Sequence, residues 1–273
     1  KNYYANEPDP EATAALFARD MAWQAQAGGD TVLAYNLMMG TCALASAVGG
    51  KVTRTEDKRF WIDPAVLGPG DVDRLPEPEA LGGLVGKAVE NYRFVTARLK
   101  GYLPPRVPDM QGPLSTASMI WKQDDFLLAF YDSPDAVHRL LDKVTRYIIA
   151  VFRYFLDHFE NSQTISWPPI YMPQKMGVGI TEDFMHLVSP EIYEEFGLPY
   201  VNRIADEFGG VFIHCCGRFE QHWPVVHRVH NLRGLDTMYS FSHPARLHEA
   251  FPNIVHTMGL DYAEDVRTFK ARG

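Results

Sequence analysis

The tripeptide His214-Cys215-Cys216 holds the side chains best suited to chemistry in this sequence. It ends an apolar run that begins at Val211, and Gly217 follows it, as expected of a buried strand that leads into a loop. Side chains alternate across a strand, so His214 and Cys216 share one face and Cys215 points to the other. Imidazole and thiolate suit zinc, so this pattern predicts metal ligands at His214 and Cys216. The alternative is a core histidine beside a buried cysteine, since a catalytic zinc needs about three protein ligands.

Acidic and amide side chains follow other predicted strands. Glu182 and Asp183 end a short apolar run, where two acids could supply a metal ligand, a base or a group that orients a ligand. We expect them to be catalytic and one of them to orient the acceptor or a metal ligand. Asp109 and Gln111 follow a predicted strand, and Asp236 ends another. Because the carboxyl ends of parallel strands meet at one edge, we expect Asp109, Gln111 and Asp236 to line a substrate pocket there.

Each acidic residue also has a structural interpretation. Glu182 and Asp183 could lie in a solvated loop, and Asp109 could form a turn. Asp261 ends a further predicted strand and could instead cap the helix after it. Several histidines on predicted helices or turns are expected to lie mostly at the surface: His222, His227, His230, His243 and His248.

The C-terminal third predicts the elements that position these residues. A helix opens at Ser189 and stops at Gly209, and strands are expected over 211–215, 233–237 and 254–258. Strands that alternate with helices through short connections are typical of a parallel sheet, either a barrel or a doubly wound sheet. No glycine-rich phosphate-binding motif follows any of these strands.

The N-terminal part predicts mostly helices. One strand is expected over 31–35 and another near Val107. The stretch 59–78 is expected to be irregular, and 161–179 is expected to be a loop or a short strand. Helices are predicted over about 9–27, over 79–100, from Pro113, from Asp124, and as a long amphipathic helix over 133–160.

Composition limits the classes of partner. The chain has 273 residues and a formal net charge of -8, which argues against nucleic acid and against anionic membrane surfaces. No apolar run approaches the ~20 residues that cross a bilayer, and the first ten residues lack the apolar segment of a secretory signal. The three cysteines cannot form a disulfide framework, so we expect a reducing, cytoplasmic setting. The expected partner is a small-molecule substrate.

Motifs across about 105–262 resemble the uroporphyrinogen decarboxylase superfamily. They are Asp109-Met110-Gln111-Gly112-Pro113-Leu114, Ser133-Pro134, Gly179-Ile180, Ser189-Pro190-Glu191-Ile192-Tyr193, Leu198-Pro199-Tyr200 and His214-Cys215-Cys216-Gly217. The resemblance implies an α/β fold of the (β/α)8 TIM-barrel type, with one domain over 1–273 and a pocket at the carboxyl ends of the strands.

Within that superfamily, the chain is more similar to the zinc-dependent methyltransferases that act with corrinoid proteins. The metal motif of that branch, His-x-Cys-Gly, is matched by His214, Cys216 and Gly217. The resemblance implies a zinc ion, methyl transfer between a corrinoid carrier and a thiol-type acceptor, and a corrinoid protein as partner. By analogy the third ligand of the family, a cysteine near the last strand, falls after Gly273 together with the last β/α unit.

True uroporphyrinogen decarboxylases differ from this sequence at several positions. Their opening Arg-Gln-Ala-Gly-Arg motif is absent, an expected aspartate aligns with Gly40, and an expected pocket tyrosine falls near Met119. A substrate with many carboxylates would meet few cations here. A decarboxylase (lyase) of a carboxylated substrate is therefore the second hypothesis, and a non-catalytic ligand-binding barrel is the third. The methyl donor, the acceptor and a homodimer are left open.

Overall fold

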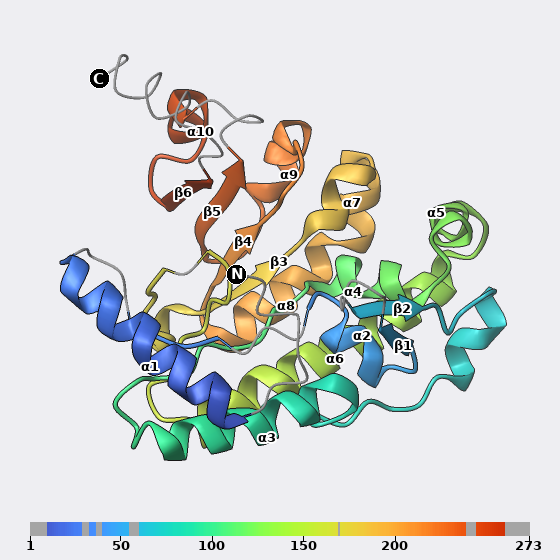
Figure 1. Cartoon of the computed structure of the whole chain (residues 1–273). Helices are drawn as coiled ribbons and strands as arrows, with labels where there is room; N and C mark the ends of the chain where they lie inside the picture. The colour runs from blue at the N-terminus through green and yellow to red at the C-terminus, as the bar shows by residue number, and fades with distance from the viewer. Residues whose placement is uncertain are drawn as a thin grey trace.

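The computed structural model describes residues 10–28, 33–36, 40–54, 60–168, 170–238 and 244–259. Its main sheet has four strands, β3 (Val178–Thr181), β4 (Val211–His214), β5 (Leu232–Met238) and β6 (Val255–Gly259). They lie in the order β3-β4-β5-β6, and every neighbouring pair is parallel (Figure 1). The predicted parallel α/β class is confirmed.

Single parallel bridges continue this order toward the N-terminus. Tyr35 pairs with Pro105, and Arg106 pairs with Gln163. The amide of Gly179 in β3 then donates to the carbonyl of Thr164 at 2.9 Å. Consecutive chain segments therefore lie side by side as an arc, which is the strand order of a (β/α) barrel. Within the described ranges no pairing closes the arc between β6 and Tyr35, so the closed eight-stranded barrel stays a prediction.

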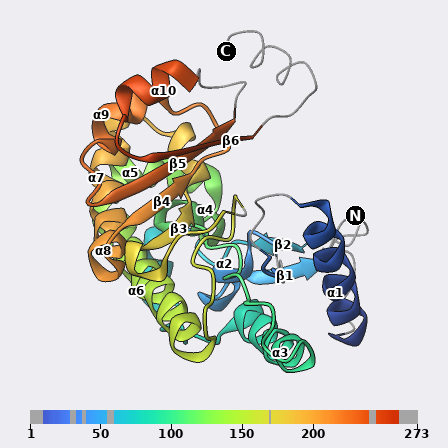
Figure 2. The same ribbon diagram turned by 90° about the vertical axis from the view of Figure 1, so that its left-hand side faces the viewer.

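Helices α6 to α10 lie along one side of the main sheet (Figure 2). The helices of the described segments are α1 (Pro10–Ala27), α2 (Ala43–Ala47), α3 (Gly83–Arg98), α4 (Pro113–Ile120), α5 (Gln123–Asp132), α6 (Pro134–His158), α7 (Pro190–Phe196), α8 (Leu198–Phe208), α9 (Trp223–Val226) and α10 (Pro244–Ala250). Short 3-10 helices are η2 (Pro69–Arg74), η3 (Gln174–Met176), η4 (Asp183–Leu187) and η5 (Glu220–His222). No helix in the described segments is both long and apolar enough to cross a membrane.

Two predicted elements need correction. The single helix expected from Ser189 to Gly209 is broken at Gly197, because Pro199 in the first turn of α8 has no N–H to continue the ladder of α7. The stretch 59–78, expected to be irregular, contains strand β2 (Phe60–Asp63), which pairs antiparallel with β1 (Lys51–Arg54). The strand expected over 31–35 is described only from residue 33, where Tyr35 forms a bridge.

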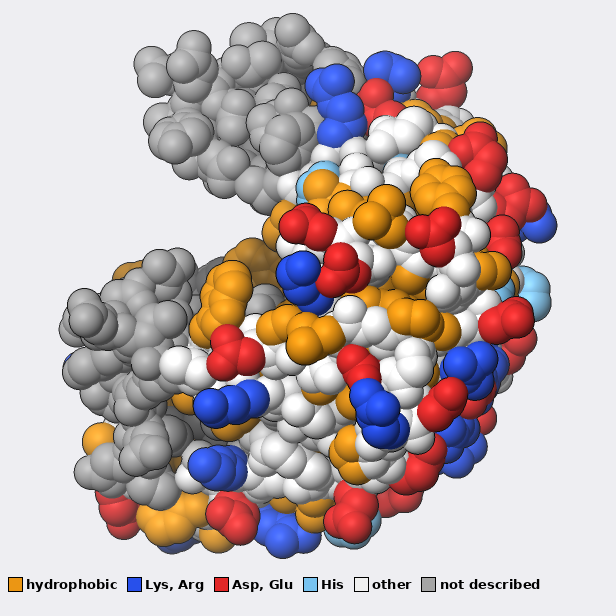
Figure 3. All heavy atoms as spheres, turned by 90° about the vertical axis from the view of Figure 1, so that its right-hand side faces the viewer, with side chains coloured by type: hydrophobic (Ala, Val, Ile, Leu, Met, Phe, Trp, Pro, Cys, Tyr) orange, Lys and Arg blue, Asp and Glu red, His pale blue; other side chains and the backbone are white. Residues whose placement is uncertain are grey.

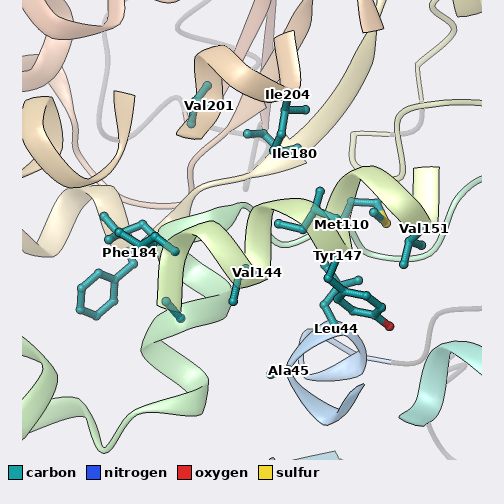
Figure 4. Packing of buried hydrophobic residues seen from close by; sticks show 14 of the residues in the cluster. Leu44, Ala45, Met110, Val144, Tyr147, Val151, Ile180, Phe184, Val201 and Ile204 are labelled. Atoms are coloured by element: carbon teal, nitrogen blue, oxygen red, sulfur yellow. The ribbon is translucent and has the colours of Figure 1, made fainter. Parts of the chain in front are cut away.

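The long helix α6 anchors the core. Its apolar positions recur every three or four residues, which places Leu140, Val144 and Tyr147 on one buried face. Pro134 at its first turn follows Ser133, a typical helix start. Figure 4 shows Val144, Tyr147 and Val151 of α6 among apolar side chains of α2, β3 and α8. This packing fixes the sheet against the helical layer.

The two faces of β4 enter different apolar clusters. Val211, Ile213 and Cys215 belong to the large core against the helices. Phe212 instead packs with Ile165 and Met172 in a second cluster. Since side chains alternate along a strand, His214 projects on the face of Phe212, away from the helical core.

Charged side chains of both signs are interspersed on the face shown in Figure 3 and form no basic stripe there.

The histidines of the C-terminal third differ in burial. His227, His230 and His248 are exposed as predicted. His222 is fully buried, and its Nε2 lies 3.0 Å from the carbonyl oxygen of Val188. The surface assignment of His222 was therefore wrong. His243 lies outside the described residues.

Candidate metal centre

The strand register places polar residues in one row at the carboxyl end of the sheet. Thr181 of β3 is opposite His214 of β4, and His214 is opposite Asp236 of β5. Asp236 is in turn opposite Thr257 of β6. Residues in register across parallel strands have side chains on the same face, so the row is built by backbone pairing. The candidate site begins with this row.

His214 is held by Asp236 and points its other ring nitrogen at Cys216. Its side chain is 3% exposed, and its Nδ1 forms a hydrogen bond with the Oδ2 of Asp236. Because the carboxylate of Asp236 accepts this hydrogen bond, Nδ1 carries a proton, and in the neutral ring Nε2 then has a lone pair that can bind a metal. That Nε2 lies 3.0 Å from the Sγ of Cys216. Asp236 also accepts a hydrogen bond from the hydroxyl of Thr257. The sequence predicted Asp236 in the lining of a substrate pocket, and the structure places its carboxylate against His214 and Thr257.

The protonation of His214 reflects these contacts. Burial opposes a charge on the ring, but the hydrogen bonds to Asp236 and Cys216 outweigh burial and raise the pKa of His214 to about 10. A cation is thus favoured at this position. A metal ion at Nε2 would take the place of the proton.

Asp183 joins the pair from the neighbouring strand end. Its Oδ1 accepts a hydrogen bond from the amide of Cys216 at 2.7 Å and lies 3.9 Å from the Nε2 of His214. One ligand atom from each of Asp183, His214 and Cys216 lies within 4.8 Å of the others. Of the roles considered for Asp183, its position suits that of a metal ligand.

Gly217 permits the turn after Cys216. A Cβ at this position would lie 2.1 Å from the ring of His186, and the Nδ1 of that ring forms a hydrogen bond with the carbonyl oxygen of Asp183. The glycine of the His-x-Cys-Gly pattern therefore allows η4, which carries Asp183, to pack directly against the cysteine loop.

Glu182 lies beside the cluster but turns away from it. Its fully buried carboxylate accepts from the amides of Leu114 and Ser115, each at 3.2 Å, and from the Ser115 hydroxyl at 3.0 Å. Burial raises the pKa of Glu182 to about 7 against these hydrogen bonds. Glu182 thus caps the N-terminus of α4, and its contacts give no support to the predicted role in orienting an acceptor.

Asp109 and Gln111 form a buried pair near the cluster. Asp109 accepts from the Nε2 of Gln111 at 3.1 Å and from the hydroxyl of Thr181 at 3.4 Å. Burial raises the pKa of the Asp109 carboxyl, and the negative charge of Asp183 adds to the effect. Gln111, predicted to line the pocket, is 2% exposed and instead orients Asp109. Asp261 and the predicted third cysteine ligand lie outside the described residues.

Trp167 is a site residue that the sequence did not reveal. Its ring lies edge-on to the ring of His214, with centroids 6.4 Å apart, and the side chain is 50% exposed. It belongs to the proline-rich stretch 161–179, which carries no periodic signal. Its position depends on how that stretch folds back over the sheet.

The donor set fits a zinc ion. Nitrogen, thiolate and carboxylate are its ordinary ligands, and bonds of ~2.0–2.3 Å in a tetrahedron separate neighbouring ligand atoms by ~3.5 Å. The separations of 3.0 and 3.9 Å from the Nε2 of His214 lie close to that value. Within the described part of the chain, the only ion-pair partner of Asp183 or Asp236 is His214. No lysine or arginine pairs with either carboxylate in the described segments, so a metal cation could take the place of the His214 proton between them.

A parallel α/β sheet with such a cluster at its carboxyl edge is the arrangement of an α/β enzyme. The family model described as "Uroporphyrinogen decarboxylase (URO-D)" matches residues 26–166. The chain therefore belongs to the uroporphyrinogen decarboxylase family. The matched span includes Asp109 and Gln111, whereas Asp183, His214 and Cys216 follow it.

A solved structure has the same fold. The chain is similar to a methyltransferase from Methanosarcina mazei with a TM-score of 0.70 and 14% sequence identity. The match covers 92% of this chain and 71% of that one. No curated protein matches the sequence.

Proposed function

We propose that this protein is a zinc-dependent methyltransferase that moves a methyl group between a corrinoid carrier and a thiol-type acceptor. The observation that carries the proposal is the convergence of Asp183, His214 and Cys216. The Nε2 of His214, the Sγ of Cys216 and a carboxylate oxygen of Asp183 would hold the metal. Three protein ligands with one open position are typical of catalytic zinc sites. Asp183 would be the third ligand among the described residues.

The chemistry required is activation of a thiol. A free thiol has a pKa of ~8.5 and is mostly protonated at neutral pH, and zinc supplies a thiolate by binding the sulfur. The sulfur–methyl bond then forms as the bond from the methyl group to its carrier breaks. The electron pair of the broken bond stays on the carrier, and the thiol proton passes to solvent.

Three carboxyl groups have supporting roles in this proposal. Asp236 keeps the proton of His214 on Nδ1, which leaves Nε2 available as a ligand. Asp109, fixed by Gln111 and Thr181, lines the acceptor side of the pocket. Glu182 positions α4 and thereby the loop that carries Asp109.

A decarboxylase of a carboxylated substrate is disfavoured by charge. Asp109 is buried in this region, and in the described segments neither it nor Asp183 pairs with a lysine or arginine. A substrate carboxylate would meet like charges, which repel. The acids instead match a metal cation.

The test uses methylcobalamin as a small-molecule donor and 2-mercaptoethanol as acceptor under anaerobic conditions. We expect zinc-loaded protein to demethylate the cobalamin and form the thioether, and the Cys216→Ala variant to lose this activity by at least a hundredfold. Equal rates in both proteins would contradict the proposal. Metal-independent product formation from uroporphyrinogen would favour the decarboxylase instead.

A further inference from the structure

The segment that carries Trp167 is fixed at both ends by one buried side chain. The Nη1 of Arg106 donates to the carbonyl oxygen of Ile165 at 2.8 Å and to that of Ile170 at 2.9 Å. Arg106 is 2% exposed, and it forms no ion pair with the described acids. This buried guanidinium has two carbonyl acceptors and no carboxylate partner, so its role is to fix the backbone of residues 165 and 170.

The same segment rests on the face of the sheet that carries the metal cluster. Ile165 and Ile170 pack with Met172 and with Phe212 of β4. Phe212 and His214 lie two residues apart in β4 and share a face. Trp167, between the two isoleucines, reaches His214 with its ring while half of its surface stays open to solvent.

We infer that Trp167 forms an aromatic wall of the substrate site, that Arg106 positions this wall, and that the substrate carries an apolar or aromatic group next to its thiol. The inference rests on the proposed function. A half-exposed indole beside a polar cluster offers a large flat surface that a bound ring can cover. Small hydrophilic thiols would reach the metal without touching it. The wall therefore sets preference among acceptors.

The first experiment compares two thiols on cobalt-substituted protein, whose visible absorption reports cysteine ligation and thiol binding. Trp167→Ala is expected to weaken benzyl mercaptan binding about tenfold. The affinity for 2-mercaptoethanol is expected to change by less than about twofold, and the cobalt content should not change. The matched control is Trp23→Ala, which removes a tryptophan that is 70% exposed on α1. An equal effect on both thiols, or no effect on either, would overturn the inference.

The positioning role of Arg106 has its own readout. Arg106→Met keeps much of the side-chain length but removes the donors, so it should weaken benzyl mercaptan binding as Trp167→Ala does. The double variant should then show no further loss, as expected of residues that act through one another. Arg106→Lys, which keeps a charged donor, should fall between wild type and Arg106→Met. Wild-type affinity in the Arg106→Met protein would overturn the positioning role.

A third arm separates the wall from the metal. Benzyl alcohol, which has no thiol, is titrated by calorimetry into metal-free protein and into metal-free Trp167→Ala. If benzyl alcohol binds the metal-free wild type but not metal-free Trp167→Ala, the aromatic wall is supported, whether or not the protein binds cobalt. A failure to bind cobalt would count only against the proposed function. Identical heats in the two proteins would contradict the wall.

Discussion

The hydrogen bond between the Nδ1 of His214 and the Oδ2 of Asp236 joins two residues that face each other in register on β4 and β5. It determines which nitrogen of the ring can bind a metal. The other nitrogen, Nε2, lies 3.0 Å from the Sγ of Cys216, so the orientation of the proposed metal ligand is built into the sheet.

Replacing Asp236 should weaken metal binding without removing a ligand. Asp236→Asn can donate to Nδ1 and stabilise the wrong tautomer, so we expect zinc affinity to fall about 10–100-fold. Competition with a zinc-binding dye measures the affinity, and the circular dichroism spectrum should stay unchanged. Thr257→Val, which removes only the second hydrogen bond to Asp236, should have a smaller effect. An unchanged affinity in Asp236→Asn would show that the hydrogen bond does not orient the ring.

A methyl group at Gly112 should destabilise the fold. A Cβ there would lie 2.5 Å from the carboxyl carbon of Glu182, which cannot move without losing its bonds to the first turn of α4. We expect Gly112→Ala to lower the free energy of unfolding by about 1–3 kcal/mol, measured by urea denaturation. Gly70→Ala, where nothing lies within 4 Å, is the matched control. Equal stabilities of the two variants would argue against the close packing of Glu182 on Gly112.

Buried His222 should make stability depend on pH. Burial lowers its pKa from 6.5, against the hydrogen bond to Val188, so the folded state keeps it neutral where the unfolded chain takes up a proton. The unfolded state then binds more protons, and stability is lost as pH falls below about 6.5. We therefore expect the protein to be less stable at pH 5.5 than at pH 7.5, and part of that difference to come from this residue. In His222→Gln the difference in unfolding free energy between the two pH values should shrink, and an unchanged difference would contradict the assignment.

The sequence predicts the parts of the site that depend on local periodicity. Alternation along one strand places His214 and Cys216 on a common face, and the structure brings their ligand atoms together. It also placed Asp183 at a neighbouring strand end. Parallel strands follow from the regular alternation of the C-terminal third, and the structure confirms them.

Other parts depend on contacts between distant segments and could not be read from the chain. The pairing of Asp236 with His214 requires the register of β4 and β5. The capping contact of Glu182, which follows β3, is made with Ser115 of α4, 67 residues away in the sequence. Trp167 lies in an aperiodic stretch, and its position follows from the two carbonyl contacts of Arg106.

Metal content tests the central claim most directly. Protein purified without chelators is analysed for zinc, beside His214→Ala and Asp183→Asn. The matched control is His230→Ala, since His230 pairs with Asp206 at 2.9 Å on the exposed surface. We predict close to one zinc per chain in wild type and in His230→Ala, and little or none in the two site variants. Zinc-free wild type that also fails to take up added zinc, or equal zinc in all four proteins, would contradict a metal centre at Asp183, His214 and Cys216.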